Sequence, residues 1–214
     1  EKALKAIAEG RFSDEIVPLT VTVGRKEVLF DQDEYPRETN LEKLASLRPS
    51  FKKDGTVTAG NASGINDGCA ILVLMSQEKA VELGIPVLAY IEASASSGLD
   101  PNYMGLGPIE ASKKALAKIQ KTTADINLFE VNEAFAAQSI PVLTELGIDP
   151  EKANVNGGAI ALGHPIGASG ARILVTLIHE LEKRNGHLGL CSLCIGGGQG
   201  ISMIVSNAKK HNKE

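Results

Sequence analysis

The sequence lacks the features that mark several large protein classes. Its 214 residues include no tryptophan, 4% aromatic residues and three cysteines. The longest apolar stretches, such as residues 71–75 and 173–178, are far shorter than the roughly 20 residues that a membrane-spanning helix needs. The 26 acidic residues outnumber the 22 lysines and arginines, for a net charge of −4, which argues against nucleic acid as the main partner. We therefore expect neither a nucleic-acid partner nor a membrane.

The three cysteines cannot all pair, and their spacing is not that of a secreted disulfide scaffold. Cys191 and Cys194 form a C-x-x-C, which leaves a zinc or redox site as an alternative. That pair stands in a β-like run before three glycines and has no second half-site, so we expect no bound metal. We expect the protein to be located in the reducing cytoplasm. The chain has no signal segment and begins at Glu1 within a helical pattern, so we expect a truncated or processed start.

Apolar residues, at 43%, and 22 glycines indicate α/β packing with many tight turns. From about residue 66, apolar runs and helical periods alternate, which predicts a buried, mostly parallel sheet covered by helices. Residues 1–65 are more polar and irregular, typical of an insertion or subdomain. The expected strands are 16–23, 69–76, 87–94, 126–131, 188–195 and 201–206, and the expected helices are 2–9, 78–83, 109–118, 133–146 and 167–184.

Three polar side chains stand where expected strands end, which is where open α/β sheets bind ligands. Asn132 follows the strand at 126–131, and its alternative role is that of a helix N-cap. His164 lies among glycines at a tight turn, where it is either structural or catalytic. Cys194 precedes three glycines whose N–H groups could hold an oxyanion, or it is an inert buried thiol. Their shared position favours an active site.

Several runs together resemble the thiolase family. They are TAGNASG at 58–64, GLGP at 105–108, VNEAFA at 131–136, NVNGGAIALGHPIGASG at 154–170 and CIGGGQG at 194–200. The runs occur in the order and spacing of the family and span nearly the whole chain, and those with the histidine and the cysteine are the most specific.

The resemblance implies a thiolase-like α/β fold, with a mixed, mostly parallel five-stranded sheet covered by helices. It places the end of a coenzyme A (CoA)-binding loop domain at residues 1–65, the last part of the N-terminal thiolase half at 66–86 and the C-terminal thiolase domain at 87–214. It also implies a homo-oligomer, either a dimer or a tetramer.

The reaction that the resemblance implies is an acyl transfer. Two acetyl-CoA molecules condense reversibly to acetoacetyl-CoA and CoA, or CoA cleaves a 3-ketoacyl-CoA in reverse. By resemblance, His164 activates a nucleophilic cysteine and joins an oxyanion hole, which Asn132 completes through a water. Cys194 moves the α-proton of acetyl-CoA, and the Gly196 N–H binds the tetrahedral oxyanion.

Coenzyme A is expected as substrate and product, with no permanently bound cofactor. The resemblance assigns CoA contacts to one serine, its small neighbours, two phenylalanines and an arginine. These residues are Ser63, Ala62, Gly64, Ala59, Phe51, Phe135 and Arg37. The spacing near Arg37 is one residue shorter than the family pattern, so a solvated surface charge remains its alternative.

The family's nucleophilic cysteine lies in a Cys-Gly-Ser-Gly type of run, which these 214 residues do not contain. Cys69 stands where the family has a small core residue, so we expect it to be buried and inert. We therefore expect the N-terminal thiolase half to be missing from this chain and to act as its partner, with the chain alone inactive. A non-catalytic acyl-CoA or lipid-binding fragment is the alternative, and Cys194 argues against a decarboxylating condensing enzyme, a ketosynthase or HMG-CoA synthase relative.

Overall fold

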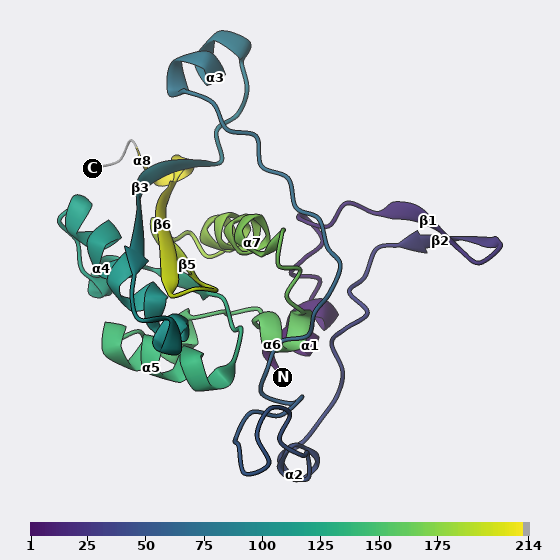
Figure 1. Ribbon diagram of the computed structural model, residues 1–214. Coiled ribbons are helices and arrows are strands. Elements are labelled where there is room, and N and C mark those ends of the chain that lie inside the picture. The colour runs from purple at the N-terminus through teal and green to yellow at the C-terminus, as the bar shows by residue number, and fades with distance from the viewer. Residues whose placement is uncertain (212–214) are drawn as a thin grey trace.

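The computed structural model describes residues 1–211, and a mixed β-sheet near the C-terminus positions the candidate site (Figure 1). Its strands are β3 (Ala89–Gly98), β4 (Leu128–Val131), β5 (Leu188–Ile195) and β6 (Gln199–Asn207). A separate hairpin consists of β1 (Leu19–Val23) and β2 (Lys26–Phe30). The α-helices are α1 (Lys2–Ala8), α2 (Leu41–Ala45), α3 (Gln77–Leu83), α4 (Gly107–Lys118), α5 (Ala136–Leu146), α6 (Ala159–Leu162), α7 (Ser169–Lys183) and α8 (Ala208–His211). Short 3-10 helices are η1 (Pro101–Leu106), η2 (Thr123–Asp125) and η3 (Pro150–Lys152).

The order of strands in the sheet is β3-β6-β5-β4, so residues 1–211 contribute four strands and not the expected five. The sheet is mixed, as expected, but only β4 and β5 pair in parallel, whereas β6 is antiparallel to both β3 and β5. The expectation of a mostly parallel sheet was therefore wrong for these residues. The reason is the short glycine turn at 196–198, since a connection of this length can only join antiparallel neighbours.

Helices cover both faces of the sheet: α4 and α5 lie on one side and α7 on the other (Figure 1). Along β4, Phe129 and Val131 join the α4–α5 core, while Leu128 joins the core under α7. The alternation follows from the two-residue period of a strand. The amphipathic pattern at 167–184 forms α7 as expected, and its residues Ile173, Leu177 and Leu181 are fully buried.

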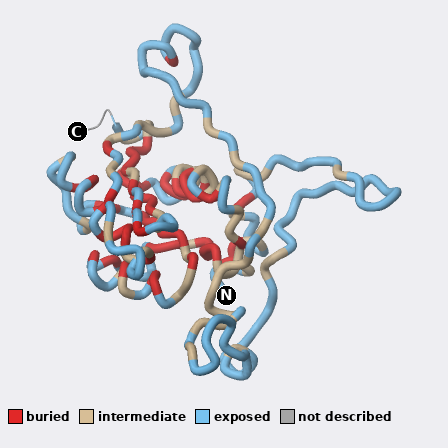
Figure 2. Tube along the Cα trace, in the orientation of Figure 1, coloured by how far each residue is buried: buried red, intermediate tan, exposed pale blue. Residues whose placement is uncertain are grey.

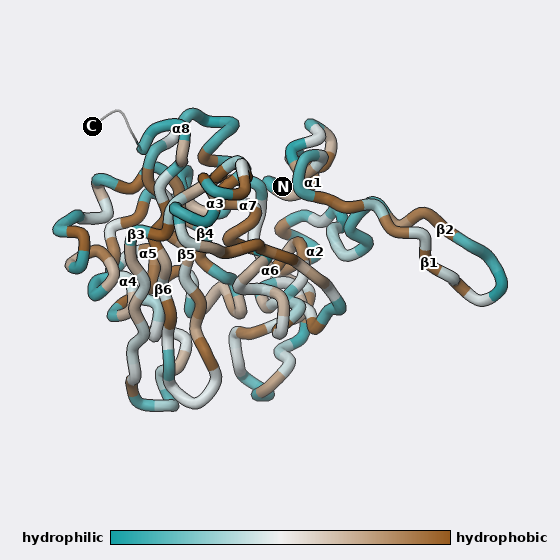
Figure 3. The backbone as a smooth tube through the Cα atoms, turned by 90° about the horizontal axis from the view of Figure 1, so that it is seen from above, coloured by the Kyte–Doolittle hydropathy of each residue, from teal (hydrophilic) through white to brown (hydrophobic). Residues whose placement is uncertain are grey.

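A long segment before the sheet runs over the outside of the molecule and is mostly exposed (Figure 2). The expected strand at 69–76 was wrong, because these residues have no regular structure and Val73 is 80% exposed. Among residues 1–211 no strand lies alongside to accept its backbone hydrogen bonds, and an apolar run becomes a strand only through such pairing. Figure 3 shows that the protruding β1–β2 hairpin also carries apolar stretches.

The described residues, 1–211, include no helix with both the length and the apolar character needed to cross a membrane.

Candidate active site

The end of β4, the end of β5 and the turn before α7 bring the three candidate side chains to one edge of the sheet. Val131 on β4 is opposite Ser192 on β5, and these two strands are parallel. Asn132, directly after β4, and Cys194, near the end of β5, therefore both lie at the carboxyl ends of parallel strands. The Asn132 amide donates to the Ser192 carbonyl at 2.9 Å, which extends the pairing by one residue. His164 reaches Asn132 from the turn between α6 and α7.

His164 is held on three sides. Its ring Nε2 lies 3.4 Å from Asn132 Nδ2, and its Nδ1 lies 2.6 Å from the hydroxyl of Ser169. Its backbone N–H donates to Asn66 Oδ1 at 3.1 Å, and Ile65 pairs with His164 as an isolated parallel bridge. The ring is thereby fixed with Nε2 directed toward Asn132 and Nδ1 toward Ser169.

Asn132 is 1% exposed, and its Oδ1 has no hydrogen-bond partner among residues 1–211. The expectation that it begins the next helix was wrong, because α5 starts at Ala136 with Phe135 as its N-cap. Residues 133–135 are not helical: the chain bends at Ala134, and Phe135 pairs with Ala62 as an isolated antiparallel bridge. Asn132 is therefore not an N-cap, and its buried oxygen is free to accept a hydrogen bond from a ligand.

Cys194 is half-buried near the end of β5, and the glycine turn at 196–198 follows it. Gly197 and Gly198 have φ angles of 88° and 86°, a region that residues with a side chain rarely adopt. Burial raises the pKa of the Cys194 thiol, so this group is protonated at neutral pH and can donate a proton. Gly196 opens the turn next to it, and its N–H belongs to the same end of the sheet.

The electrostatics of His164 are opposite to those of Cys194. Burial, and secondarily the positive charge of Arg172, lower the pKa of His164. The imidazole is therefore neutral at pH 7 and can accept a proton, while the Cys194 thiol can supply one. Two groups whose surroundings push their proton affinities apart are the usual arrangement of an acid and a base.

The segment at 61–66 runs directly beside the loop that follows β4. Ser63 donates from its N–H (3.0 Å) and its hydroxyl (3.1 Å) to the Ala134 carbonyl, and Ala62 bridges to Phe135. Phe51 meets Phe135 edge-to-face with ring centroids 6.1 Å apart. Most of the predicted CoA-contacting residues are thus gathered beside Asn132.

The remaining predicted CoA contacts are Gly64, Arg37 and Ala59. Gly64 packs against the ring of Tyr35, which leaves no room for a side chain, and Arg37 lies over that ring at 5.5 Å. Arg37 and Ala59 are both exposed. Arg37 is therefore connected to Gly64 through Tyr35, a link that its spacing in the sequence does not reveal.

Four polar residues of the site were not predicted from the sequence. They are Asn66, Glu133, Asn154 and Ser169, which hold the backbone or the ring of the candidate residues. Their partners are 5 to 98 residues away in the chain or are backbone atoms, so the pattern of residue types gives no signal for them. The glycine pair at 157–158 is the one hint, because it marks a close approach that proves to involve Glu133.

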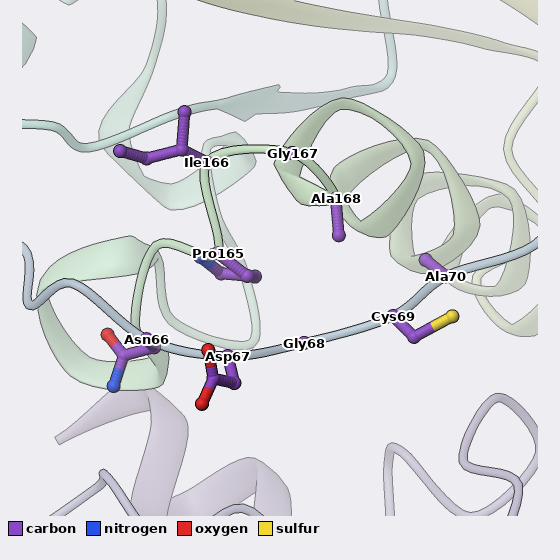
Figure 4. A pocket seen from close by; sticks show the side chains of 9 residues that line it. All are labelled: Asn66, Asp67, Gly68, Cys69, Ala70, Pro165, Ile166, Gly167 and Ala168. Carbon is purple, nitrogen blue, oxygen red and sulfur yellow. The ribbon is translucent and has the colours of Figure 1, made fainter.

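The other cysteines differ from Cys194. The expectation that Cys69 is buried was wrong: it is exposed in the extended segment at 66–70, with its thiol directed away from Pro165 (Figure 4). Burial, and secondarily the charge of Glu130, raise the pKa of Cys191 to about 12. Within residues 1–211 no group of three or more histidine, cysteine or acidic side chains is placed to hold a metal ion.

Sequence comparison assigns the chain to one protein family. A profile described as "Thiolase, C-terminal domain" matches residues 85–207, and one described as "Thiolase, N-terminal domain" matches residues 1–78. The chain belongs to the thiolase family. Because a profile of the N-terminal domain matches here, the expectation that the N-terminal half is missing is not supported; that the chain alone is inactive stays a prediction.

Individual relatives carry a more specific name. The chain is 58% identical over 205 residues to "Acetyl-CoA acetyltransferase" of Syntrophomonas wolfei, with 95% of this chain and 52% of the relative covered. It is 57% identical to the protein of the same name from Escherichia coli (strain K12), again with 95% and 52% covered. The chain thus spans about half the length of the curated relatives that it matches.

Solved structures agree in fold. The Bacillus anthracis acetyl-CoA acetyltransferase superposes with a TM-score of 0.94 at 54% identity, covering 96% of this chain and 52% of that one. The human mitochondrial 3-ketoacyl-CoA thiolase in complex with CoA superposes with a TM-score of 0.88 at 43% identity, covering 97% and 52%.

Proposed function

We propose that this chain provides the proton-transfer and oxyanion-binding side of a thiolase that condenses two acetyl-CoA molecules to acetoacetyl-CoA and CoA, or cleaves 3-ketoacyl-CoA in reverse. The observation that carries the proposal is the meeting of His164 Nε2 and Asn132 Nδ2 at 3.4 Å, on the sheet edge that also presents Cys194. The relatives named acetyl-CoA acetyltransferase support the choice of acetyl-CoA.

In this proposal, the neutral His164 imidazole takes the proton of an acyl-accepting thiol, and the resulting thiolate attacks the ketone carbon of a 3-ketoacyl-CoA. The bond from that carbon to the α-carbon then breaks, and its electron pair goes to the α-carbon of the leaving acetyl-CoA. Cys194 donates its thiol proton to that carbon, which fits the protonated state that burial favours. Cleavage of the acyl-enzyme by CoA supplies a thiol proton that restores Cys194.

The negative charge that develops on oxygen in these steps is stabilised by hydrogen-bond donors that are already in position. His164 and, through a bound water, Asn132 stabilise the thioester enolate, and the Gly196 N–H stabilises the tetrahedral oxyanion. The unpartnered Oδ1 of Asn132 supports the water-binding role, since it can accept from a water while Nδ2 stays near His164. Fixed donors of this kind contribute about 3 kcal/mol each.

The CoA arm would pass along Ala62, Ser63 and Gly64, which run beside the loop after β4. The human relative that was solved in complex with CoA supports CoA as a ligand of this protein. Ala59, Phe51 and Phe135 would line the same channel, and Arg37 would meet the adenine or phosphate end. Residues 1–65, 66–86 and 87–214 would be the end of the loop domain, the last part of the first half and the C-terminal domain, in an enzyme that acts as a homo-oligomer.

The test is an assay of the protein that carries this chain, with Cys194→Ser as the decisive variant. A serine hydroxyl is far less acidic than a thiol, so cleavage of acetoacetyl-CoA should slow at least about hundredfold. Acetylation of the enzyme by acetyl-CoA, followed by intact mass, should still occur, because the departing CoA thiolate can take its proton from water when Cys194 is absent. The exposed Cys69→Ser is the matched control and should retain full activity.

Normal condensation by Cys194→Ser would remove Cys194 from the mechanism. CoA binding by calorimetry without any acyl transfer in the unmodified protein would instead favour the alternative, a non-catalytic acyl-CoA-binding protein of the same fold.

A further inference from the structure

Glu133, which directly follows Asn132, is held by amides only. Its Oε2 accepts from the N–H of Ile160 at 3.2 Å, and its Oε1 accepts from Asn154 Nδ2 at 3.3 Å. Within residues 1–211 no lysine, arginine or histidine forms an ion pair with it. The carboxylate is therefore a double hydrogen-bond acceptor that links two separate segments of backbone.

Those two segments carry the candidate catalytic groups. Asn154 donates to the Val131 carbonyl at 2.8 Å and accepts from the Val131 N–H at 2.9 Å, so it is fixed to the end of β4 just before Asn132. Ile160 belongs to α6, the single helical turn that leads into Gly163 and His164. The Glu133 carboxylate thus connects the strand end that presents Asn132 with the turn that presents His164.

Gly158 provides the second, independent observation. A methyl group built on Gly158 would overlap the carboxylate of Glu133, and all three of its nearest atoms belong to that carboxylate. The backbone of Gly158, with φ −114° and ψ −168°, is ordinary extended geometry that alanine also adopts. The glycine is therefore required by the presence of the Glu133 carboxylate and not by backbone strain.

We propose that Glu133 is a positioning residue that sets the distance between Asn132 and His164. This inference rests on the proposed function, because it concerns the same two side chains. Glu133 touches neither ring nor carboxamide at the reacting edge and acts through Asn154 and the α6 turn. An error of about 1 Å in such an arrangement can cost about hundredfold in rate.

The first experiment measures thiolysis of acetoacetyl-CoA by the protein that carries this chain. Glu133→Ala should lower kcat at least tenfold and leave KM within twofold, because the hydrogen bonds of its carboxylate go to Asn154 and Ile160 and not to the CoA-contacting serine, Ser63. Glu145→Ala, an exposed carboxylate on α5, is the matched control and should change neither constant. A Glu133→Ala variant with the kcat of the control would overturn the proposal.

The second experiment uses Gly158. Gly158→Ala should lower kcat by pushing the carboxylate away from Ile160, but in the Glu133→Ala background it should change kcat by less than twofold. Equal losses in both backgrounds would show that Gly158 acts without Glu133 and would contradict the proposal. Gly98→Ala is the control for adding a methyl group, since no atom lies within 4 Å of its position.

The third experiment does not depend on enzymatic activity and so separates this inference from the proposed function. Amide hydrogen exchange over residues 159–164 should be at least tenfold faster in Glu133→Ala than in unmodified protein, and unchanged in Glu145→Ala. If exchange there is unchanged in Glu133→Ala, the positioning role is wrong even for an active thiolase. If exchange responds in a protein without thiolysis, the link between the two segments stands and the proposed function fails.

Discussion

Two regions of this chain have similar apolar content but differ in how far their apolar residues are buried. In residues 89–207, which we call the sheet region, Leu190 is 0% exposed and helices cover both faces. In residues 17–88, the extended region, Val73 is 80% exposed and the apolar run around it forms no strand. The difference shows that an apolar run predicts burial only where the same structure provides neighbours to cover it and to pair with its backbone.

The candidate site is where the two regions meet. His164, Asn132 and Cys194 belong to the sheet region. From the extended region, Asn66 accepts from the His164 backbone N–H, and Ser63 donates to the Ala134 carbonyl two residues after Asn132. The candidate catalytic residues therefore lie in the well-packed region, whereas all expected CoA contacts except Phe135 lie in the extended region.

The largest expected effect concerns Glu130, a carboxylate buried in the sheet region, together with the half-buried Glu15 near the N-terminus. Burial raises the pKa of Glu130 from 4.5 to about 8, and Arg172 at 3.4 Å offsets only part of that rise. Burial likewise raises the pKa of Glu15 to about 7. Both groups bind protons more tightly folded than unfolded, so their contribution to stability is present below pH 4.5 and is lost as the pH rises through 7 and 8. At about 1.4 kcal/mol per pKa unit, Glu130 alone implies a loss on the order of 5 kcal/mol by pH 9.

Urea unfolding between pH 5 and pH 9 measures this loss. Glu130→Gln should flatten the dependence and be more stable than the unmodified chain at pH 9. Stability that stays constant in the unmodified chain would show that both carboxylates are already ionised at pH 5.

The contribution of Glu180 to stability depends on pH in the opposite direction. Although burial acts to raise the pKa of Glu180, hydrogen bonds from Arg11 and Arg184 hold that pKa below its ordinary value. Its contribution is therefore lost only as the pH falls through the acidic range.

The next largest effect compares truncations to alanine in the two regions. Leu190→Ala in the core under α4 and α5 should lower the free energy of unfolding by about 3 kcal/mol, because it opens a cavity. Val73→Ala in the extended region should change it by less than about 0.5 kcal/mol. Urea unfolding at one pH measures both. A large cost at Val73 would mean that the extended region is packed in solution, and the contrast between the regions would then fail.

The sequence predicted most elements of the sheet region but not the directions of its strands, and in the extended region it wrongly predicted a strand at 69–76. The physical reason is that local patterns do not show which segments pair. Strands 188–195 and 199–207 and the helix at 169–183 carry their own periodicity and turn residues, so local patterns suffice. The run at 69–76 has an equally apolar pattern, but its structure depends on partners that a pattern cannot show. Within the site, the neighbouring glycines in the sequence identified His164 and Cys194 as candidate residues. The sequence did not reveal Ser169 or Asn66, because their roles depend on contacts made only in the folded chain.

The smallest expected effect separates two of the partners of His164. Ser169, buried in the first turn of α7, lies 2.6 Å from Nδ1. Because its hydroxyl donates to the Pro165 carbonyl at 3.0 Å, it accepts from the Nδ1–H and so leaves Nε2 as the basic nitrogen. Ser169→Ala should therefore slow thiolysis about tenfold, the equivalent of one hydrogen bond of about 1.4 kcal/mol. Asn66 holds only the His164 backbone from the extended region, so Asn66→Ala should cost less than about threefold. Ser169→Thr, which keeps the hydroxyl, should recover most of the loss and is the control for the ring contact. If Asn66→Ala slows thiolysis more than Ser169→Ala does, the His164 ring is oriented mainly by the extended region and not by the sheet region. That result would contradict the contacts, in which Asn66 meets only the His164 backbone.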